Sequence, residues 1–130
     1  MPRFVLLEHT NAPDDPAGLH YDLLLEQGTA CRTWRLAGIP EEGGPDIVAV
    51  ELPPHRLAWL DHAAGEVSGG RGFARRIDAG TYEPAALPAS GASPPVVVQV
   101  TLHGERISGR LMLRATADHG LAQLLSLDAP

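Results

Sequence analysis

The chain has 130 residues, which suits one domain with one packed core, because two domains would each be marginal at this length. Its 14 glycines and 12 prolines argue against a helical bundle and favour many short elements joined by turns. The net charge of −6 argues against a strong non-specific nucleic-acid binder, although residues 71–130 carry six of the ten basic residues.

The cysteine content and the apolar runs favour a cytoplasmic protein. The single cysteine, Cys31, cannot form an internal disulfide, which fits a reducing compartment. The apolar run at residues 4–7 is too short for a signal peptide, and no run approaches the roughly 18 residues of a membrane span. We therefore expect residues 1–130 to form a single domain that has no membrane association.

The first half of the chain alternates short apolar runs with turn-rich segments. Loops are expected where Pro, Asp and Gly gather, at residues 11–18 and 39–45. Between the loops, strands are expected at residues 4–9, 19–26, 30–36 and 47–52. Gln27-Gly28 is expected to turn the chain, Pro53-Pro54 to end the fourth strand, and residues 55–70 to be irregular.

The second half contains the clearest strand periodicity. Residues 72–78 are strand-like, and residues 84–95 are expected to form a low-complexity surface loop. Apolar residues then alternate on both sides of a Gly104-Glu105 turn, at positions 96, 98, 100 and 102 and at positions 107, 111 and 113. This pattern predicts a β-hairpin, and residues 121–127 fit either a last strand or a short helix. About eight short strands at close spacing predict a mainly β fold, either a small closed barrel or a sandwich.

The most informative motif is His20-Tyr21-Asp22. On a strand, residues two apart point to the same side, so His20 and Asp22 project together. An imidazole and a carboxylate placed in this way can hold adjacent positions of one metal ion, and His9 can supply a third ligand. The alternative is a His–Asp hydrogen bond on a half-buried face.

Two further groups of residues are candidates for binding or catalysis. His55 lies in a loop-like segment with Trp59, where it can act as a general acid or contact a phosphate, or can simply be exposed. Basic side chains beside a Gly-rich turn are candidate phosphate ligands, and these are Arg71, Arg75 and Arg76. The alternating Arg106, Arg110 and Arg114 favour a solvated outer face instead.

The order of these motifs resembles the 3′-phosphoesterase domain of bacterial DNA ligase D and its stand-alone relatives. That family opens with a strand ending in His and continues with an H-Y-D strand and an S-W segment, matched by His9, residues 20–26 and Thr33-Trp34. A D-H-P-L-x-Y segment, a Gly-rich turn and a W-D-x-G-x-Y segment follow, matched by residues 54–59, 68–72 and 77–82. Residues 102–114 match the last Leu- and Gly-containing segment, so the resemblance covers nearly the whole chain.

The resemblance implies a compact β-barrel with small flanking helices and metal-dependent trimming of DNA 3′ ends. His9, His20 and Asp22 would hold one divalent metal, with Mn²⁺ favoured and Zn²⁺ as the second choice. Family members remove a terminal ribonucleoside and then a 3′-phosphate, leaving a 3′-OH. His55 matches the catalytic His that contacts phosphate, and Trp59 stands at a family Tyr. The implied partners are DNA or RNA 3′ ends, with a repair ligase or polymerase acting in trans.

Leu24 and Leu7 stand where the ligase domain has Arg and Gln. Leu24 lies two residues after Asp22, so a regular strand puts both side chains on one face. We therefore expect 3′-end trimming activity with Mn²⁺ to be very low or absent, and Leu24→Arg to raise it, provided that Leu24 is not a core residue. If Leu24 instead packs against Trp59, the Arg should destabilise the fold.

Three functional classes follow from these observations. The first is a metal-dependent phosphoesterase related to the ligase D domain. The second is a non-catalytic barrel that binds a metal, a nucleic-acid end or a protein partner, and Leu24 and Leu7 favour it. The third is a non-haem iron oxygenase, because two His and one carboxylate are also the ligand set of that class.

Overall fold

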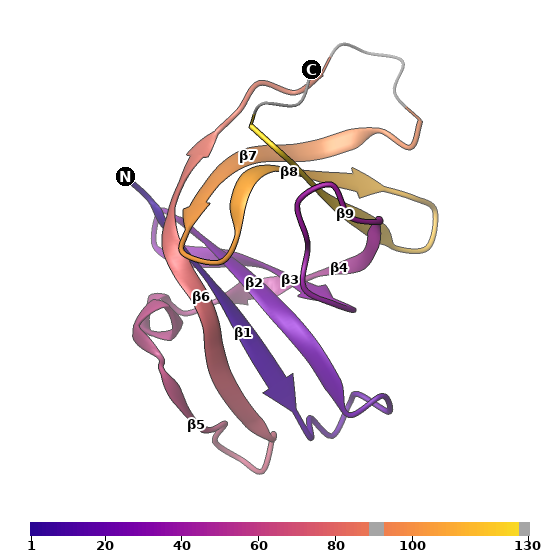
Figure 1. Ribbon diagram of the computed structural model, residues 1–130. Helices are drawn as coiled ribbons and strands as arrows, with labels where there is room; N and C mark the ends of the chain where they lie inside the picture. The colour runs from indigo at the N-terminus through magenta and orange to yellow at the C-terminus, as the bar shows by residue number, and fades with distance from the viewer. Residues whose placement is uncertain (89–92, 128–130) are drawn as a thin grey trace.

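The computed structural model describes residues 1–88 and 93–127, and most of these residues lie in β-strands (Figure 1). The strands are β1 (Arg3–Thr10), β2 (Leu19–Gln27), β3 (Ala30–Leu36), β4 (Ile47–His55), β5 (Ala64–Glu66), β6 (Phe73–Pro84), β7 (Val96–Gly104), β8 (Ser108–Ala115) and β9 (Gly120–Leu125). Within the described ranges, the expected flanking helices reduce to one short 3-10 helix, η1 (Leu57–Asp61). None of the described helical structure is long and apolar enough to cross a membrane.

Eight of the nine strands close into a ring. Their order is β1-β2-β3-β4-β9-β8-β7-β6, and β6 returns to pair with β1. β5 lies outside the ring and pairs with the first residues of β6 (Figure 1). All pairings between these strands are antiparallel, and short turns join β2 to β3, β7 to β8 and β8 to β9. The expected mainly β fold of about eight strands is therefore confirmed.

The interior of the ring holds the main hydrophobic core, which we call the inner core. Alternate residues of each strand supply it, as the period of two in the sequence predicts. Its buried members are Phe4, Leu6, Leu23, Leu25, Trp34, Leu36, Ala49, Tyr82, Val100, Leu102, Ile107, Leu111, Leu113, Ala122 and Leu124. Every ring strand contributes side chains to this core, so the packing of the core holds the whole ring together.

A buried carboxylate fixes the predicted β7–β8 hairpin. Asp78 on β6 is 5% exposed and accepts hydrogen bonds from the backbone N–H groups of Glu105, Arg106 and Ile107. A side chain on Gly104 would collide with this carboxylate, so the turn requires glycine there. Asp78 therefore has a structural role, away from the candidate metal ligands.

The structure corrects several expected boundaries. β4 continues through Pro53-Pro54 to His55, because these prolines lie where the β3–β4 register shifts and no ladder N–H is needed. β6 is longer than expected and runs to Pro84, because its second half pairs with β7. Residues 55–70, expected to be irregular, contain η1 and β5. The segment at 121–127, which fitted either a strand or a short helix, contributes to strand β9. The expected loop at 84–95 lies partly outside the described residues, which omit 89–92.

Candidate metal centre

The opposite face of β1, β2 and β3 carries a second, smaller hydrophobic cluster, which we call the outer cluster. Its buried members are Val5, Leu7, Leu24, Cys31 and Leu60. Leu60 belongs to η1, so the segment after β4 folds over this face and covers it. The outer cluster forms one half of the face, and the candidate metal ligands form the other half.

Leu24 is a core residue. It lies on the same face of β2 as His20 and Asp22, but it is 0% exposed within the outer cluster, and Trp59 packs against that cluster. The expectation that Leu24→Arg restores activity depended on an accessible position, so the structure supports the packing alternative instead. An Arg here would have to bury its guanidinium among apolar side chains.

The antiparallel register of β1 and β2 brings the three predicted metal ligands together. His9 is directly opposite His20, and Leu7 is opposite Asp22. One ligand atom from each of His9, His20 and Asp22 lies within 4.8 Å of the others. These residues form a possible metal-binding triad of two imidazole nitrogens and one carboxylate oxygen, a donor set that transition metals accept.

Groups outside the triad orient both imidazoles. His20 Nδ1 lies 2.7 Å from the Asp15 carboxylate, and His9 Nε2 lies 2.7 Å from the carbonyl oxygen of Arg71. Each contact needs a proton on that nitrogen, which leaves His20 Nε2 and His9 Nδ1 as acceptors facing Asp22. A carboxylate or carbonyl behind the ligating histidine is the usual support of a metal site.

The inner atoms of the triad lack ordinary partners. His20 Nε2 and Asp22 Oδ1 are buried and 3.4 Å apart, yet neither has a hydrogen-bond partner among the described residues. Buried polar atoms nearly always find a partner, so two unsatisfied atoms at one point need an explanation. A metal ion coordinated by both atoms provides one, and the triad therefore fits a divalent metal.

The surroundings of the triad shift two ionisation equilibria. Burial is the largest influence on the pKa of His20 and lowers it, but the neighbouring carboxylates of Asp22 and Asp15 together outweigh burial, so the pKa is raised. The hydrogen bond from His20 is the main reason that the pKa of Asp15 is lowered. Protons therefore compete with a metal for His20 more strongly than for an isolated histidine.

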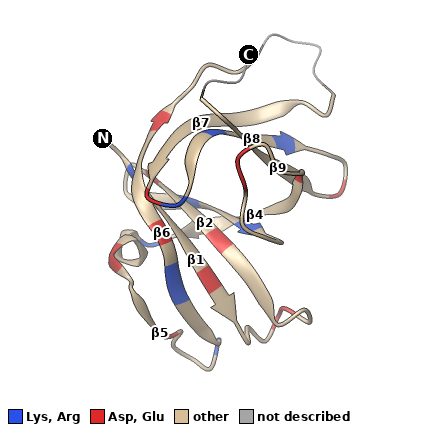
Figure 2. Cartoon of the chain, viewed as in Figure 1, with Lys and Arg blue, Asp and Glu red and all other residues tan. Residues whose placement is uncertain are grey.

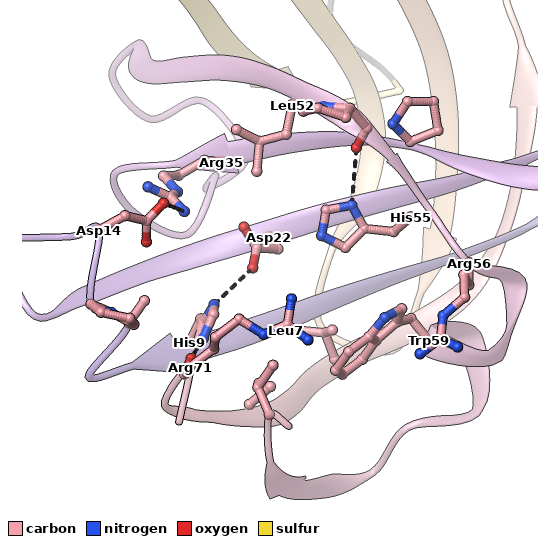
Figure 3. A pocket seen from close by; sticks show the side chains of 16 residues that line it. Leu7, His9, Asp14, Asp22, Arg35, Leu52, His55, Arg56, Trp59 and Arg71 are labelled. Atoms are coloured by element: carbon pink, nitrogen blue, oxygen red, sulfur yellow. Dashed lines mark hydrogen bonds and ion pairs between the residues drawn. The ribbon is translucent and has the colours of Figure 1, made fainter. Parts of the chain in front are cut away.

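The triad opens onto a cavity of about 580 Å³. His9 and Asp22 line this cavity together with His55 and Trp59 from the segment that follows β3. Figure 3 shows the Asp22 carboxylate near the centre of the view, with His9 and His55 on different sides of it. His55 Nδ1 lies 3.1 Å from the carbonyl oxygen of Pro53, which leaves Nε2 available to the cavity. The structure thus brings both predicted catalytic residues to the cavity of the predicted metal ligands.

The three predicted phosphate ligands are placed differently. Arg71 lines the cavity, although its guanidinium already donates to the carbonyl and hydroxyl oxygens of Ser68. Arg75 does not line the cavity and pairs with Glu8 at 3.2 Å. Figure 2 shows a blue, basic stretch of β6 beside red, acidic stretches of β1 and β2. Arg76 also lies away from the cavity wall and donates to the carbonyl oxygen of His62.

Two residues of the site were missed by sequence reasoning. Asp15 lies in a loop without periodicity, so nothing in the sequence connects it to His20. Arg35 lines the cavity and is the direct cross-strand neighbour of Asp22. The sequence could have predicted that Arg35 lies opposite Asp22, because the tight turn after Gln27 pairs Gln27 with Ala30 and so fixes the β2–β3 register.

Comparison with known proteins identifies the family. A family model described as the DNA ligase D 3′-phosphoesterase domain matches residues 9–114, which begin at His9 and end in β8. The matched range contains the triad, His55 and Trp59. Comparison with curated proteins finds no match. The match covers most of the chain, and the closed β ring with the triad on its outer face agrees with it. The chain therefore belongs to the DNA ligase D 3′-phosphoesterase domain family.

Proposed function

We propose that this protein is a metal-dependent phosphoesterase that acts on 3′-terminal phosphate or ribonucleotide ends of DNA or RNA. The observation that carries the proposal is the triad with its two unsatisfied atoms, His20 Nε2 and Asp22 Oδ1, beside a cavity that His55 also lines. Family membership supports this substrate class over an oxygenase with the same ligand set.

The triad would hold one divalent cation, with Mn²⁺ favoured and Zn²⁺ as the second choice. Such an ion, when bound, polarises a phosphoryl oxygen and stabilises the charge that develops on it. Hydrogen bonds that His20 donates to the Asp15 carboxylate and His9 donates to the Arg71 carbonyl keep the two rings in the orientation that ligation needs. The protein thus supplies a prepared donor set rather than one assembled on binding.

His55 is the proposed acid for the leaving oxygen. With Nδ1 donating to the Pro53 carbonyl, Nε2 carries a proton only in the imidazolium form, which is the form that can protonate a leaving group. Trp59 contributes an apolar wall and an indole N–H donor beside His55. Of the three predicted phosphate ligands, Arg71 is the proposed contact at the cavity because it alone of the three lines it, and Arg75 and Arg76 remain predictions for the surrounding nucleic-acid strand.

A non-catalytic protein that binds a metal or a nucleic-acid end is the second candidate. The buried Leu24 favours it, because this position offers the cavity neither a charge nor a donor. A repair ligase or polymerase acting in trans is the proposed protein partner for either candidate. The two candidates differ in turnover, so measurements of product release separate them.

The test uses a primer with one 3′-terminal ribonucleotide and a second primer with a 3′-phosphate, each incubated with Mn²⁺. We expect slow release of the ribonucleoside or phosphate by the wild type and none by His20→Ala or His55→Ala. Metal binding, measured by calorimetry, should be lost in His20→Ala and kept in His55→Ala.

The matched control is His103→Ala, which removes an exposed histidine on β7 that pairs with Glu83. It should keep both metal binding and activity. Metal binding without product release on either primer would favour the non-catalytic candidate. Equal metal uptake by wild type and His20→Ala would contradict a metal site at the triad, and with it the phosphoesterase candidate and the metal-binding form of the second candidate.

A further inference from the structure

Arg35 is the basic residue closest in register to the triad. It lies on β3 directly opposite Asp22 on β2, and residues opposite each other in an antiparallel pair point to the same face. Its neighbours along the strand, Trp34 and Leu36, belong to the inner core, so Arg35 points outward, where it lines the cavity. Figure 3 shows its guanidinium at the Asp14 side of Asp22.

The guanidinium of Arg35 is only partly satisfied. Its Nη2 donates to Asp14 Oδ2 at 3.2 Å, while its Nε is buried and lacks a hydrogen-bond partner among the described residues. The Asp14 side chain is 70% exposed and lies in the loop between β1 and β2. An exposed ion pair of this kind is weak, because water competes with both partners. The bond to Asp14 therefore leaves Arg35 free to exchange partners.

The other basic residues near the cavity are less suited to bind an anion deep beside the triad. Arg71 already uses Nε and Nη2 on Ser68. Arg56 lies on the exposed rim, next to His55 in the sequence. Arg35 alone among these three combines a position opposite a triad residue with a buried N–H that has no partner in the described part of the chain.

We propose that Arg35 binds the terminal phosphoryl group of the substrate, and that Asp14 occupies the guanidinium until a phosphate replaces it. This inference rests on the proposed function, because it assigns the residue that positions the phosphate in the same cavity. Nε and one Nη of a guanidinium form a planar fork that matches two phosphate oxygens. The buried Nε then gains the partner that it lacks, and Asp14 moves to solvent, where a carboxylate is well hydrated.

The obvious competing role for Arg35 is structural, since the pair with Asp14 ties the loop of residues 11–18 to β3. The two roles make opposite predictions for Asp14. If Arg35 binds phosphate, removing the Asp14 charge removes a competitor, and anion affinity rises. If Arg35 only holds the loop, removing either partner loosens the same contact, and both variants behave alike.

The experiment measures binding of thymidine 3′-monophosphate by NMR titration in EDTA at pH 8, with thymidine as the probe that lacks a phosphate. We expect Arg35→Ala to weaken binding of the monophosphate by about tenfold to a hundredfold, as for loss of hydrogen bonds to a charged group. Arg35→Lys should weaken it by less, because the charge stays and the fork is lost. Asp14→Asn should strengthen it by a few fold, and thymidine binding should not respond to any of the variants.

Equal weakening by Arg35→Ala and Asp14→Asn would overturn the proposal in favour of the structural role, as would unchanged binding in Arg35→Ala. Asp14 is exposed, so its variant remains informative even if Arg35→Ala does not fold. The measurement uses neither metal nor turnover. Phosphate binding that depends on Arg35 in a protein without 3′-trimming activity would therefore separate this inference from the failure of the proposed phosphoesterase function.

Discussion

The two faces of β1 and β2 are built from alternating residues of the same strands, yet they carry different structures. On the inner face, Leu6 and Leu23 join a core that all eight ring strands share. On the outer face, Leu7 and Leu24 join a smaller cluster, which η1 covers with the buried Leu60 and the partly buried Trp59. The inner face is closed by strand pairing, whereas the outer face is closed by segments that return from a distance along the chain.

This difference explains why the candidate site is on the outer face. A ring interior packed with apolar side chains leaves little room for water or substrate. The segments that cover the outer face also carry the groups that orient the metal ligands. Asp15 comes from the β1–β2 loop, and the carbonyl of Arg71 comes from the turn before β6. Stability and chemistry are thus divided between the two faces.

The largest expected effect is that of a charge placed in the outer cluster. Leu24→Arg should lower the free energy of unfolding by about 3–5 kcal/mol, because the guanidinium is buried without a partner. Leu24→Met, which keeps the volume, should cost less than about 1.5 kcal/mol. Urea unfolding measures both, and 3′-trimming activity should not rise in the Arg variant. Equal unfolding midpoints for Arg and Met would show that position 24 reaches the cavity after all.

Truncating one leucine on each face tests whether the faces differ in cooperativity. Leu111→Ala in the inner core should destabilise the whole protein by about 2–5 kcal/mol. Leu60→Ala should instead act mainly on the cover, because residues 57–72 can open while the ring stays closed. Hydrogen exchange should therefore show lost protection throughout the chain in the first variant and near η1 in the second. Uniform loss in both variants would mean that the outer cluster is part of one cooperative core.

The turn that supports His9 depends on a glycine. A Cβ on Gly72, which has φ +91°, would collide with the carbonyl oxygen of Thr10, so Gly72→Ala should displace the neighbouring Arg71 carbonyl from His9. We expect a cost of about 1–3 kcal/mol and weaker metal binding. Gly70→Ala is the matched control, since Gly70 also has a positive φ, +70°, but open space around it. Identical metal affinities in the two variants would show that the Arg71 carbonyl does not help to orient His9 for metal binding.

The hydrogen bond between His20 and Asp15 is the second contact that orients a metal ligand, and variants of Asp15 test it. Asp15→Ala should weaken metal binding by about 10–100-fold, the usual effect of losing a group behind a ligating histidine. Asp15→Asn, which keeps an oxygen acceptor, should lose less, and Asp118→Ala in an exposed turn should lose nothing. Calorimetric titration with Mn²⁺ and Zn²⁺ measures the effect. A full-affinity Asp15→Ala variant would show that the His20 ring is held by β2 alone.

The smallest expected effect concerns pH. Because the folded-state pKa of His20 is raised, its charged form stabilises the metal-free protein below the unfolded value of about 6.5, and this stability is lost as pH rises through the folded pKa. Metal affinity changes in the opposite direction and should rise by up to about tenfold per pH unit over the same window. Calorimetry between pH 6 and 8 checks this, and His20→Gln should flatten the stability profile. A metal affinity independent of pH would argue against His20 as a ligand.

Much of the fold and of the triad could be predicted from the sequence because it depends on near neighbours. The period of two put His20 and Asp22 on one face, and the Gly104-Glu105 turn identified the hairpin of β7 and β8. The expected strand ends failed at Pro53-Pro54 and beyond residue 78, where pairing partners decided the length.

The amino-acid sequence by itself determined the alternating strands, the metal-ligand types and their family pattern. Only the tertiary structure decided that Leu24 lies in a core and that Asp15 and the Arg71 carbonyl orient the histidines. It also decided that the Arg35 Nε–H has no partner within residues 1–88 and 93–127. The physical reason is separation along the chain. Strand periodicity and tight turns are local, whereas the contact between His9 and Arg71 joins residues 62 positions apart and forms only when the cover closes on the ring.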